Sequence, residues 1–226
     1  AMDPQQRLFL QGCWAALEDA GYADRDLNRM KCGVYAGALG RDYAELFNAT
    51  PHEADSFELM GTQGSILSAH ISYFLNLTGP SVTLDTACSS SLVAIDLGVK
   101  AIQNGDIDMA LAGGVNFFLT PTFYILMSKA QMLSADGKCK AFDNRADGFV
   151  PGEGVGIVVL KNLRSALRDR DHIYGLVVGS GTNQDGKSNG ITAPNALAQQ
   201  ELQEDVHRRY GVDPTTIGYV ETHGTG

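Results

Sequence analysis

A strand, a helix and a second strand follow one another in the middle of this sequence, and this order most constrains the fold. Residues 82–86 are apolar and β-branched, and residues 109–115 form a continuous apolar run. Between them, residues 89–104 carry apolar side chains at helical spacing and are followed by Gly105, a typical helix C-cap. Because parallel strands need a crossover connection of this kind, the sequence predicts a parallel βαβ unit.

The helix predicted over residues 89–104 contains the small residues Ala94 and Gly98, which favour burial on most sides. The central helix of a layered α/β protein is buried in this way. Hydrophobic residues make up 44% of the 226 residues, and a chain of this length buries roughly 70–75% of its unfolded surface. The chain is therefore predicted to form one large or two small α/β domains.

Further elements are expected on both sides of this unit. The predicted helices cover residues 4–19, 65–75, 163–168 and 195–210, and the predicted strands cover residues 32–39, 149–160, 174–179 and 217–221. Residues 41–62 are mixed and polar, and we interpret them as a variable surface segment. Residues 180–194 are expected to form a long polar loop.

The charge balance excludes a general nucleic-acid binder, because 26 acidic residues against 17 basic ones give a formal charge of -9. No apolar run approaches the roughly 18 residues that a membrane helix requires, and no secretory leader is recognisable. The four cysteines form no CxxC pair, so neither a zinc site nor a redox motif is expected. These features predict a cytoplasmic protein with no nucleic-acid or membrane partner.

Cys88 lies between the predicted strand and the predicted helix, and it is the candidate nucleophile. The unpaired N–H groups and the positive dipole at a helix N-terminus favour a thiolate and can face a developing oxyanion. A nucleophile on a strand-to-helix turn is a recurring catalytic arrangement. The alternative is a buried, inert thiol, which is our interpretation of the other three cysteines, Cys13, Cys32 and Cys139.

His223 follows the predicted strand 217–221 and precedes a glycine-rich turn. The carboxyl ends of strands in α/β sheets are where ligands bind, so this imidazole is the candidate partner of Cys88 in acyl chemistry. The alternative is a hydrogen-bonded structural residue. That alternative is our interpretation of the remaining histidines, His52, His70, His172 and His207.

Two further patterns carry weaker signals. The glycines of residues 152–156 lead into a strand rather than a helix, so they lack the helix dipole that a phosphate-binding loop uses. Asp143 and Asp147 lie near Arg145, and we expect them to close a turn rather than to bind a metal ion, which needs several converging oxygens. No metal site is predicted.

Four separated motifs resemble the β-ketoacyl synthase domain of modular polyketide synthases. They are residues 85–92, residues 138–156, residues 183–186 and residues 222–226. The opening residues 2–7 are similar to the family as well. The resemblance covers essentially the whole chain, and four motifs in the family's order are far more specific than one.

The resemblance implies a thiolase-like fold, with duplicated five-stranded α/β layers, in a homodimer that pairs through strand 82–86. Cys88 would accept the growing acyl chain from an acyl carrier protein. His223 would be the first of two histidines that assist decarboxylation of a malonyl extender, and Thr225 would hydrogen-bond the phosphopantetheine arm. No cofactor is expected to bind directly, because the substrates are carried on the phosphopantetheine of the carrier protein.

The family's second histidine and its lysine lie downstream of the His223 motif and are absent here, as is an N-terminal strand before Met2. The chain is therefore interpreted as an incomplete domain, an internal piece of a longer protein. It would hold the N-terminal half of the fold to about residue 180 and the start of the C-terminal half from about 181. We expect this piece alone not to complete condensation, and to be poorly soluble because its sheet edges are open.

Residues 144–145 and 149–152 resemble synthases that are served by a separate acyltransferase. Ala69 and His70 stand where the family pattern has asparagine and arginine, which puts local contacts there in doubt.

The function favoured by these residues is decarboxylative condensation of an acyl chain on Cys88 with a malonyl-type extender. The first alternative is a non-condensing domain that transfers chains or serves as a dimer scaffold, for which the downstream histidine would be absent from the parent protein. The second is a cysteine hydrolase, which would need an orienting Asn or Asp near His223.

Overall fold

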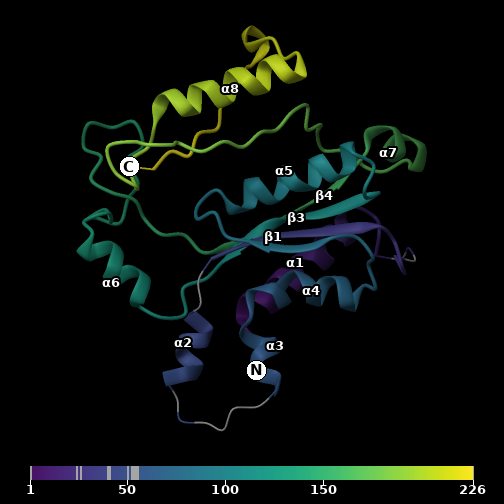
Figure 1. The fold of residues 1–226 in the computed structure, drawn as a ribbon, viewed down its shortest axis with the longest axis horizontal. Helices are drawn as coiled ribbons and strands as arrows, with labels where there is room; N and C mark the ends of the chain where they lie inside the picture. The colour runs from purple at the N-terminus through teal and green to yellow at the C-terminus, as the bar shows by residue number, and fades with distance from the viewer. Residues whose placement is uncertain are drawn as a thin grey trace.

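The structure is a computed structural model that describes residues 2–23, 25, 27–39, 42–49, 51 and 56–225. Its centre is a four-stranded sheet in the order β2-β1-β3-β4 (Figure 1). The strands are β1 (Cys32–Ala38), β2 (Ser81–Leu84), β3 (Met109–Asn116) and β4 (Gly154–Lys161). β1 pairs in parallel with both β2 and β3, whereas β4 is antiparallel to β3.

The predicted βαβ unit is confirmed, with one refinement: β1 lies between its two strands. α5 (Ser90–Gln103) crosses over β1 to connect β2 with β3. β2 ends at Leu84, before the predicted end at residue 86, because the chain turns there toward α5. β4 starts at Gly154, later than the predicted residue 149, because Phe149 instead forms an isolated bridge with Leu133.

Helices cover both faces of the sheet. α5 lies on one face, and α1 (Pro4–Asp19) and α4 (Gly64–Phe74) lie on the other (Figure 1). α1 begins at the predicted residue, where Asp3 Oδ1 accepts a hydrogen bond from the Gln5 amide at 2.8 Å. Its buried side chains Phe9, Cys13 and Leu17 recur every four residues and form the core beneath the sheet.

α5 approaches the sheet closely because small residues line its contact face. A Cβ atom on Gly98 would lie 3.3 Å from the Ala110 Cβ, and Ala94 is fully buried. The opposite face of α5 is more open than expected, since Leu92 is 70% exposed. The prediction of burial on most sides is therefore wrong for the outward face of the first turn of this helix, which no second layer covers within the described residues.

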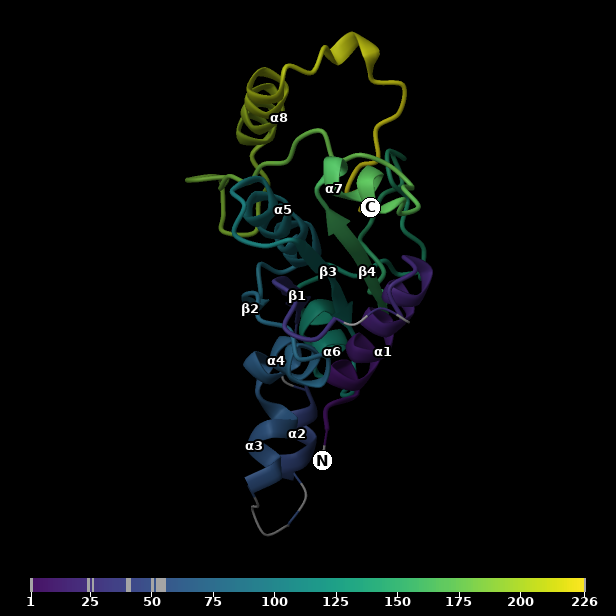
Figure 2. The same ribbon diagram turned by 90° about the vertical axis from the view of Figure 1, so that its right-hand side faces the viewer.

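Residues 41–62, interpreted as a variable surface segment, lie largely at the surface but contain two helices that were not predicted. These are α2 (Asp42–Ala49) and α3 (Ser56–Thr62), which project from the body near the N-terminus (Figure 2). Acidic residues in the first turn of α2 favour a helix there, and the rings of Tyr43 and Phe47 lie 5.9 Å apart, one helical turn along. The polarity of the segment concealed this helical spacing.

Three more helices follow in the second half of the chain: α6 (Thr122–Lys129), α7 (Leu163–Asp169) and α8 (Ala196–Tyr210), with a short 3-10 helix at Pro214–Thr216. α7 and α8 were predicted within a residue or two, whereas α6 was not. The described helices include none that is both long and apolar enough to cross a bilayer.

The strands predicted over residues 174–179 and 217–221 do not form. Both segments are extended, but neither pairs with another strand within the described residues. A strand requires a hydrogen-bonded neighbour, which an apolar pattern alone does not provide. Their apolar side chains remain largely exposed; Leu176 and Val220 are examples.

Candidate active site

Cys88 lies on the turn that connects β2 with α5, and its thiol is free and exposed. The preceding residue, Ala87, has a φ of 55°, in the left-handed region that non-glycine residues rarely adopt. Asp85 holds this conformation, because its Oδ1 accepts a hydrogen bond from the Ala87 amide at 2.9 Å. A strained residue directly before an exposed thiol is typical of a functional turn.

Ser90 closes the same turn from the other side. Its Oγ accepts a hydrogen bond from the Thr86 amide at 2.8 Å and donates one to the Ala87 carbonyl at 2.6 Å. Ser90 is buried, so these bonds are partly shielded from water. The Cys88 backbone is thus fixed by hydrogen bonds on both sides.

Two glycines bring the first turn of α5 onto the sheet. A Cβ atom on Gly37 of β1 would lie 2.6 Å from the Ser90 carbonyl carbon, and one on Gly114 of β3 would lie 2.9 Å from the Ser91 Cβ. Only glycine leaves room for this approach. Neither glycine was predicted as a site residue, although each follows an apolar run at the carboxyl end of a strand.

The N-terminus of α5 is not capped by a side chain. Ser89, at the N-cap position, instead donates its hydroxyl to the Thr86 carbonyl at 2.8 Å. The positive end of the helix dipole therefore lies beside Cys88 without a side-chain oxygen to satisfy its first turn. Such a helix end can stabilise negative charge on a bound carbonyl oxygen.

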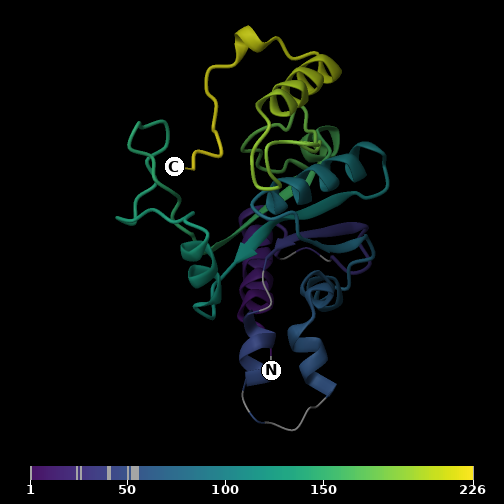
Figure 3. The ribbon, with the colours of Figure 1, turned by 60° about the vertical axis from the view of Figure 1, so that its left-hand side comes forward.

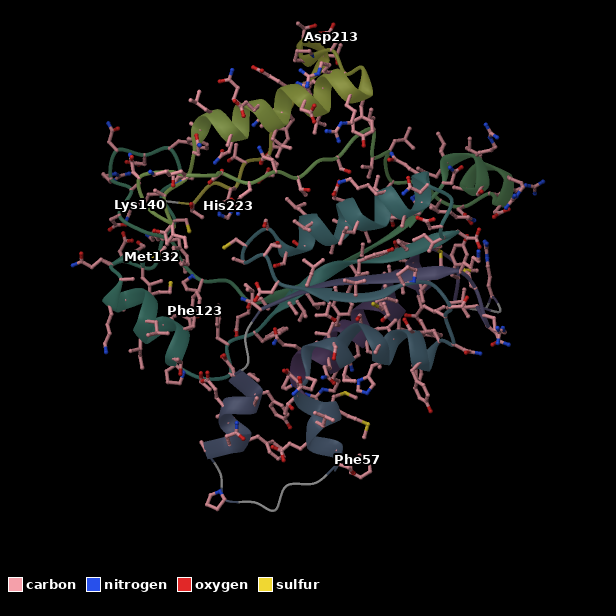
Figure 4. The ribbon with its side chains drawn as sticks, in the orientation of Figure 1. Phe57, Phe123, Met132, Lys140, Asp213 and His223 are labelled. Atoms are coloured by element: carbon pink, nitrogen blue, oxygen red, sulfur yellow. The ribbon has the colours of Figure 1, made fainter. Side chains whose placement is uncertain are left out.

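His223 and Thr225 both lie in the extended C-terminal segment, and the His223 side chain is exposed. Gly224, between them, has a φ of 58°, and a Cβ atom placed on it would lie 3.9 Å from the Ala141 Cβ. His223 accordingly lies beside the loop that carries Lys140 (Figure 4).

No contact between His223 and Cys88 is found among the described residues. The C-terminal end of the chain lies by the loop that follows α6, where Gly224 meets Ala141, and Figure 3 draws this end apart from α5. Within the described part of the chain, no hydrogen bond joins His223 to Cys88 or to an Asn or Asp side chain. The pairing of these two residues therefore stays a prediction, and the orienting group that a hydrolase needs is absent from the described contacts.

Lys140 stabilises the loop beside His223; it lies within the motif of residues 138–156 but was not predicted as a site residue. Lys140 Nζ donates to Asp136 at 2.8 Å and to Asp147 at 2.6 Å. These hydrogen bonds lower the pKa values of both carboxyl groups and raise the pKa of Lys140. Asp147 therefore belongs to an ion pair with a lysine.

Asp143 closes a turn, as predicted. Its carboxylate accepts hydrogen bonds from the Arg145 amide at 2.8 Å and from the Arg145 guanidinium at 2.7 Å. Across residues 2–225, leaving out those not described, no group of His, Cys, Asp and Glu side chains is arranged to hold a metal ion. Gly154 and Gly156, from the glycine run, lie in the antiparallel strand β4 rather than in a phosphate-binding loop.

The loop of residues 183–186 is tied to the start of α8. Asn195 caps this helix, and its Nδ2 donates to the Asp185 carbonyl at 2.8 Å. Asn183 Nδ2 donates to the Ala198 carbonyl at 2.7 Å. The motif therefore has a fixed shape within the second half of the chain.

The other cysteines differ from one another. Cys13 and Cys32 are both buried, as expected for structural cysteines. Burial raises the pKa of the Cys13 thiol and raises the pKa of Cys32 to about 12, which disfavours the reactive thiolate. Cys139 is exposed, but its sulfur accepts a hydrogen bond from the Val150 amide at 3.3 Å and so has a structural contact.

Three of the four remaining histidines lie within the described residues, and no hydrogen bond joins any of these three to the Cys88 turn. His70 lies on α4 with a buried Nδ1 that has no hydrogen-bond partner among the described residues, and His172 packs its ring against Tyr174. His207 lies on α8, whereas His52 is outside the described residues.

Comparison with known proteins gives the same family along the whole chain. The profile of the beta-ketoacyl synthase N-terminal domain matches residues 1–166, and that of the C-terminal domain matches residues 174–226. The chain is 55% identical to polyketide synthase PksL of Bacillus subtilis over 225 residues, which cover 100% of this chain and 5% of that protein. It is 46% identical over 225 residues to polyketide synthase PksN of the same organism, covering 100% of this chain and 4% of that protein.

Solved structures agree with these sequence matches. The ketosynthase from module 6 of the bacillaene synthase of Bacillus subtilis superposes with a TM-score of 0.92 at 54% identity, covering 99% of this chain and 38% of that one. An oxazolomycin ketosynthase domain from Streptomyces albus gives a TM-score of 0.88 at 36% identity, covering 100% of this chain and 39% of that one. The chain thus spans less than two fifths of either ketosynthase structure.

These matches confirm the layered, thiolase-like α/β fold that the motifs predicted. Since both family profiles and both structures cover the chain in the order of its motifs, it belongs to the β-ketoacyl synthase family, as a ketosynthase domain of polyketide synthases.

Proposed function

We propose that the complete domain containing this chain condenses an acyl chain with a malonyl-type extender, and that Cys88 is its nucleophile. The observation that carries the proposal is the turn at residues 85–90, which fixes an exposed thiol at an uncapped helix N-terminus. The hydrogen bonds around Ala87 and Ser90 hold the Cys88 backbone ready for attack on a carbonyl.

In the first half-reaction, the Cys88 thiolate attacks the thioester carbonyl of an acyl chain on an acyl carrier protein. The bond from the carbonyl to the phosphopantetheine sulfur breaks, and that thiol is released as the chain moves to Cys88. The N–H groups at the start of α5 support this step, because they can donate to the transient oxyanion. Thr225 would hydrogen-bond the phosphopantetheine arm.

In the second half-reaction, a malonyl thioester loses CO2, and the resulting carbanion attacks the acyl carbonyl on Cys88. The carbon–sulfur bond breaks and the Cys88 thiolate leaves. His223 would donate a hydrogen bond to the enolate oxygen of the extender. We further propose that the missing second histidine and lysine are needed here, so the 226 residues alone do not complete condensation.

The assembly proposed for the complete domain is a homodimer that pairs through residues 82–86. β2 supports this proposal, because it is the edge strand of the sheet and pairs only with β1 within the described residues. The extender would be supplied by a separate acyltransferase, a proposal that rests on residues 144–145 and 149–152. We place the reaction in the cytoplasm, where a reducing environment keeps an exposed thiol free.

The test separates the two half-reactions in the complete domain. The Cys88→Ala variant is expected to lose all labelling by a radioactive acyl thioester, whereas His223→Ala should be labelled and fail to condense. Labelling of Cys88→Ala at the wild-type level would overturn the proposal. A wild-type domain that is labelled but never condenses would instead favour chain transfer without condensation.

A further inference from the structure

Asp96 is a buried carboxylate in the middle of α5 that neither half-reaction uses. It is 3% exposed. Its Oδ2 accepts a hydrogen bond from Lys100 Nζ at 2.6 Å, and its Oδ1 accepts one from Ser180 Oγ at 2.7 Å. Because a buried charge is costly unless it is paired and hydrogen-bonded, both partners are needed to keep this carboxylate in the core.

Ser180 comes from the extended segment that runs between α5 and α8 (Figure 1). Its neighbours face α8: a Cβ atom on Gly179 would lie 2.4 Å from the Tyr210 ring, and one on Gly181 would lie 2.7 Å from Val206. Alternate residues of an extended chain point to opposite sides, so Ser180 faces α5 while the two glycines fit under α8. The segment is thus held on both sides.

This contact joins the two parts of the chain that the two family profiles match. Of the hydrogen bonds between described residues, two connect residues 2–166 with residues 174–225. One is the partly buried bond from Ser180 to Asp96, and the other is the exposed bond from Tyr174 to Asp19 at 2.9 Å.

We propose that Asp96 is a positioning residue, which holds the part of the domain that carries His223 in register with the helix that follows Cys88. The inference rests on the proposed function, which makes Cys88, in the first part, and His223, in the second part, the two reacting groups. Asp96 lies two turns along α5 from the Cys88 turn, on the same rigid helix. A shift of the second part along α5 therefore changes the relation between His223 and Cys88.

The test uses the complete domain and measures acyl loading of Cys88 separately from condensation. Ser180→Ala removes the bond between the two parts but leaves the ion pair of Asp96 with Lys100 intact. It is expected to slow condensation ~10-fold or more, the scale of a misplaced catalytic group, with less than a ~2-fold change in loading. Asp96→Ala should do the same, and combining the two substitutions should add no further loss.

Two variants serve as controls. Asp96→Asn keeps an oxygen that accepts from Ser180, so it should restore most of the condensation rate. Tyr174→Phe removes the exposed bond to Asp19 and should leave both half-reactions unchanged. The positioning role would be overturned if Ser180→Ala lost loading and condensation equally, or if it condensed at the wild-type rate. In either case, loading and condensation by the wild-type domain would still support the proposed function. A wild-type domain that is not loaded at all would overturn the proposed function itself.

Discussion

Gly37 controls how closely the Cys88 turn lies on the sheet, and Gly37→Ala is the substitution that tests this. The added Cβ would lie 2.6 Å from the Ser90 carbonyl carbon and 2.8 Å from the Ser91 amide nitrogen, both backbone atoms. Ordinary contact begins near 3.4 Å, so the start of α5 must move by about 0.8 Å. Neither atom belongs to a flexible side chain that could rotate away.

Two effects should follow from that movement in the complete domain. Overpacking of this kind costs about 1–3 kcal/mol of folding stability, which lowers the melting temperature by roughly 2–12 °C in a domain of 150–250 residues and by less in a larger domain. Displacing the nucleophile by nearly 1 Å should slow acyl loading of Cys88 by up to ~100-fold. Thermal unfolding and the rate of incorporation of a radioactive acyl group measure the two effects.

Gly64→Ala is the matched control, because the same added methyl group meets no atom within 4 Å at the start of α4. It should leave loading unchanged and stability equal or slightly higher. The reasoning about Gly37 is refuted if Gly37→Ala is loaded at the wild-type rate with an unchanged melting temperature.

Two further predictions concern an ion-pair cluster and the thiols. The ion-pair cluster consists of Lys161, whose side chain is 14% exposed, and of Asp169 and Asp171, to which Lys161 Nζ donates at 2.6 Å each. Lys161→Met should therefore lower the free energy of unfolding in urea by about 2 kcal/mol. An unchanged free energy of unfolding would contradict a stabilising role of this cluster. Hydrogen bonds from Arg168 and Lys161 lower the pKa of Asp169. Burial by itself raises the pKa of Asp171, but hydrogen bonds from Lys161 and Tyr22 outweigh the effect of burial, so the pKa of Asp171 is lowered overall. The two carboxylates therefore contribute their full stabilisation above the usual Asp pKa of about 3.9, and this stabilisation is lost as the pH falls through their lowered pKa values. In Lys161→Met, the free energy of unfolding should depend less steeply on pH in this acid range. In the folded protein, a thiol reagent should modify the two exposed cysteines, Cys88 and Cys139, and should reach the buried Cys13 and Cys32 only after unfolding. Mass spectrometry of the reacted protein identifies the modified residues. Modification of Cys13 or Cys32 before unfolding would contradict the described core.

The parts of the fold that were predicted well are those whose sequence signals, such as caps and apolar spacing, lie within a single helix or at its ends. α1 has a proline at its first turn and apolar residues at helical spacing, and α8 has Asn195 as its cap, so both were predicted almost to the residue. The turn at Cys88 was recognisable because a strand pattern ends directly before a helix pattern. Each of these features depends on neighbours within a few residues along the chain.

The parts that were missed depend on distant contacts. The segment 217–221 has the composition of a strand but has no hydrogen-bonded partner strand among the described residues. Gly37 is essential because of Ser90, 53 positions away, and Asp96 is stable in the core because of Ser180, 84 positions away. No periodicity in a single sequence reports contacts of this kind, because they follow from packing rather than from local propensity.

The central claim is that the Cys88 thiol carries the acyl chain. The most direct measurement is peptide mapping by mass spectrometry of the unmodified complete domain after brief incubation with an acyl thioester. We predict that the acyl mass is found on the peptide that contains Cys88 and is absent from the peptide that contains the exposed Cys139. An acyl group found on Cys139 or on another residue, with Cys88 unmodified, would contradict it.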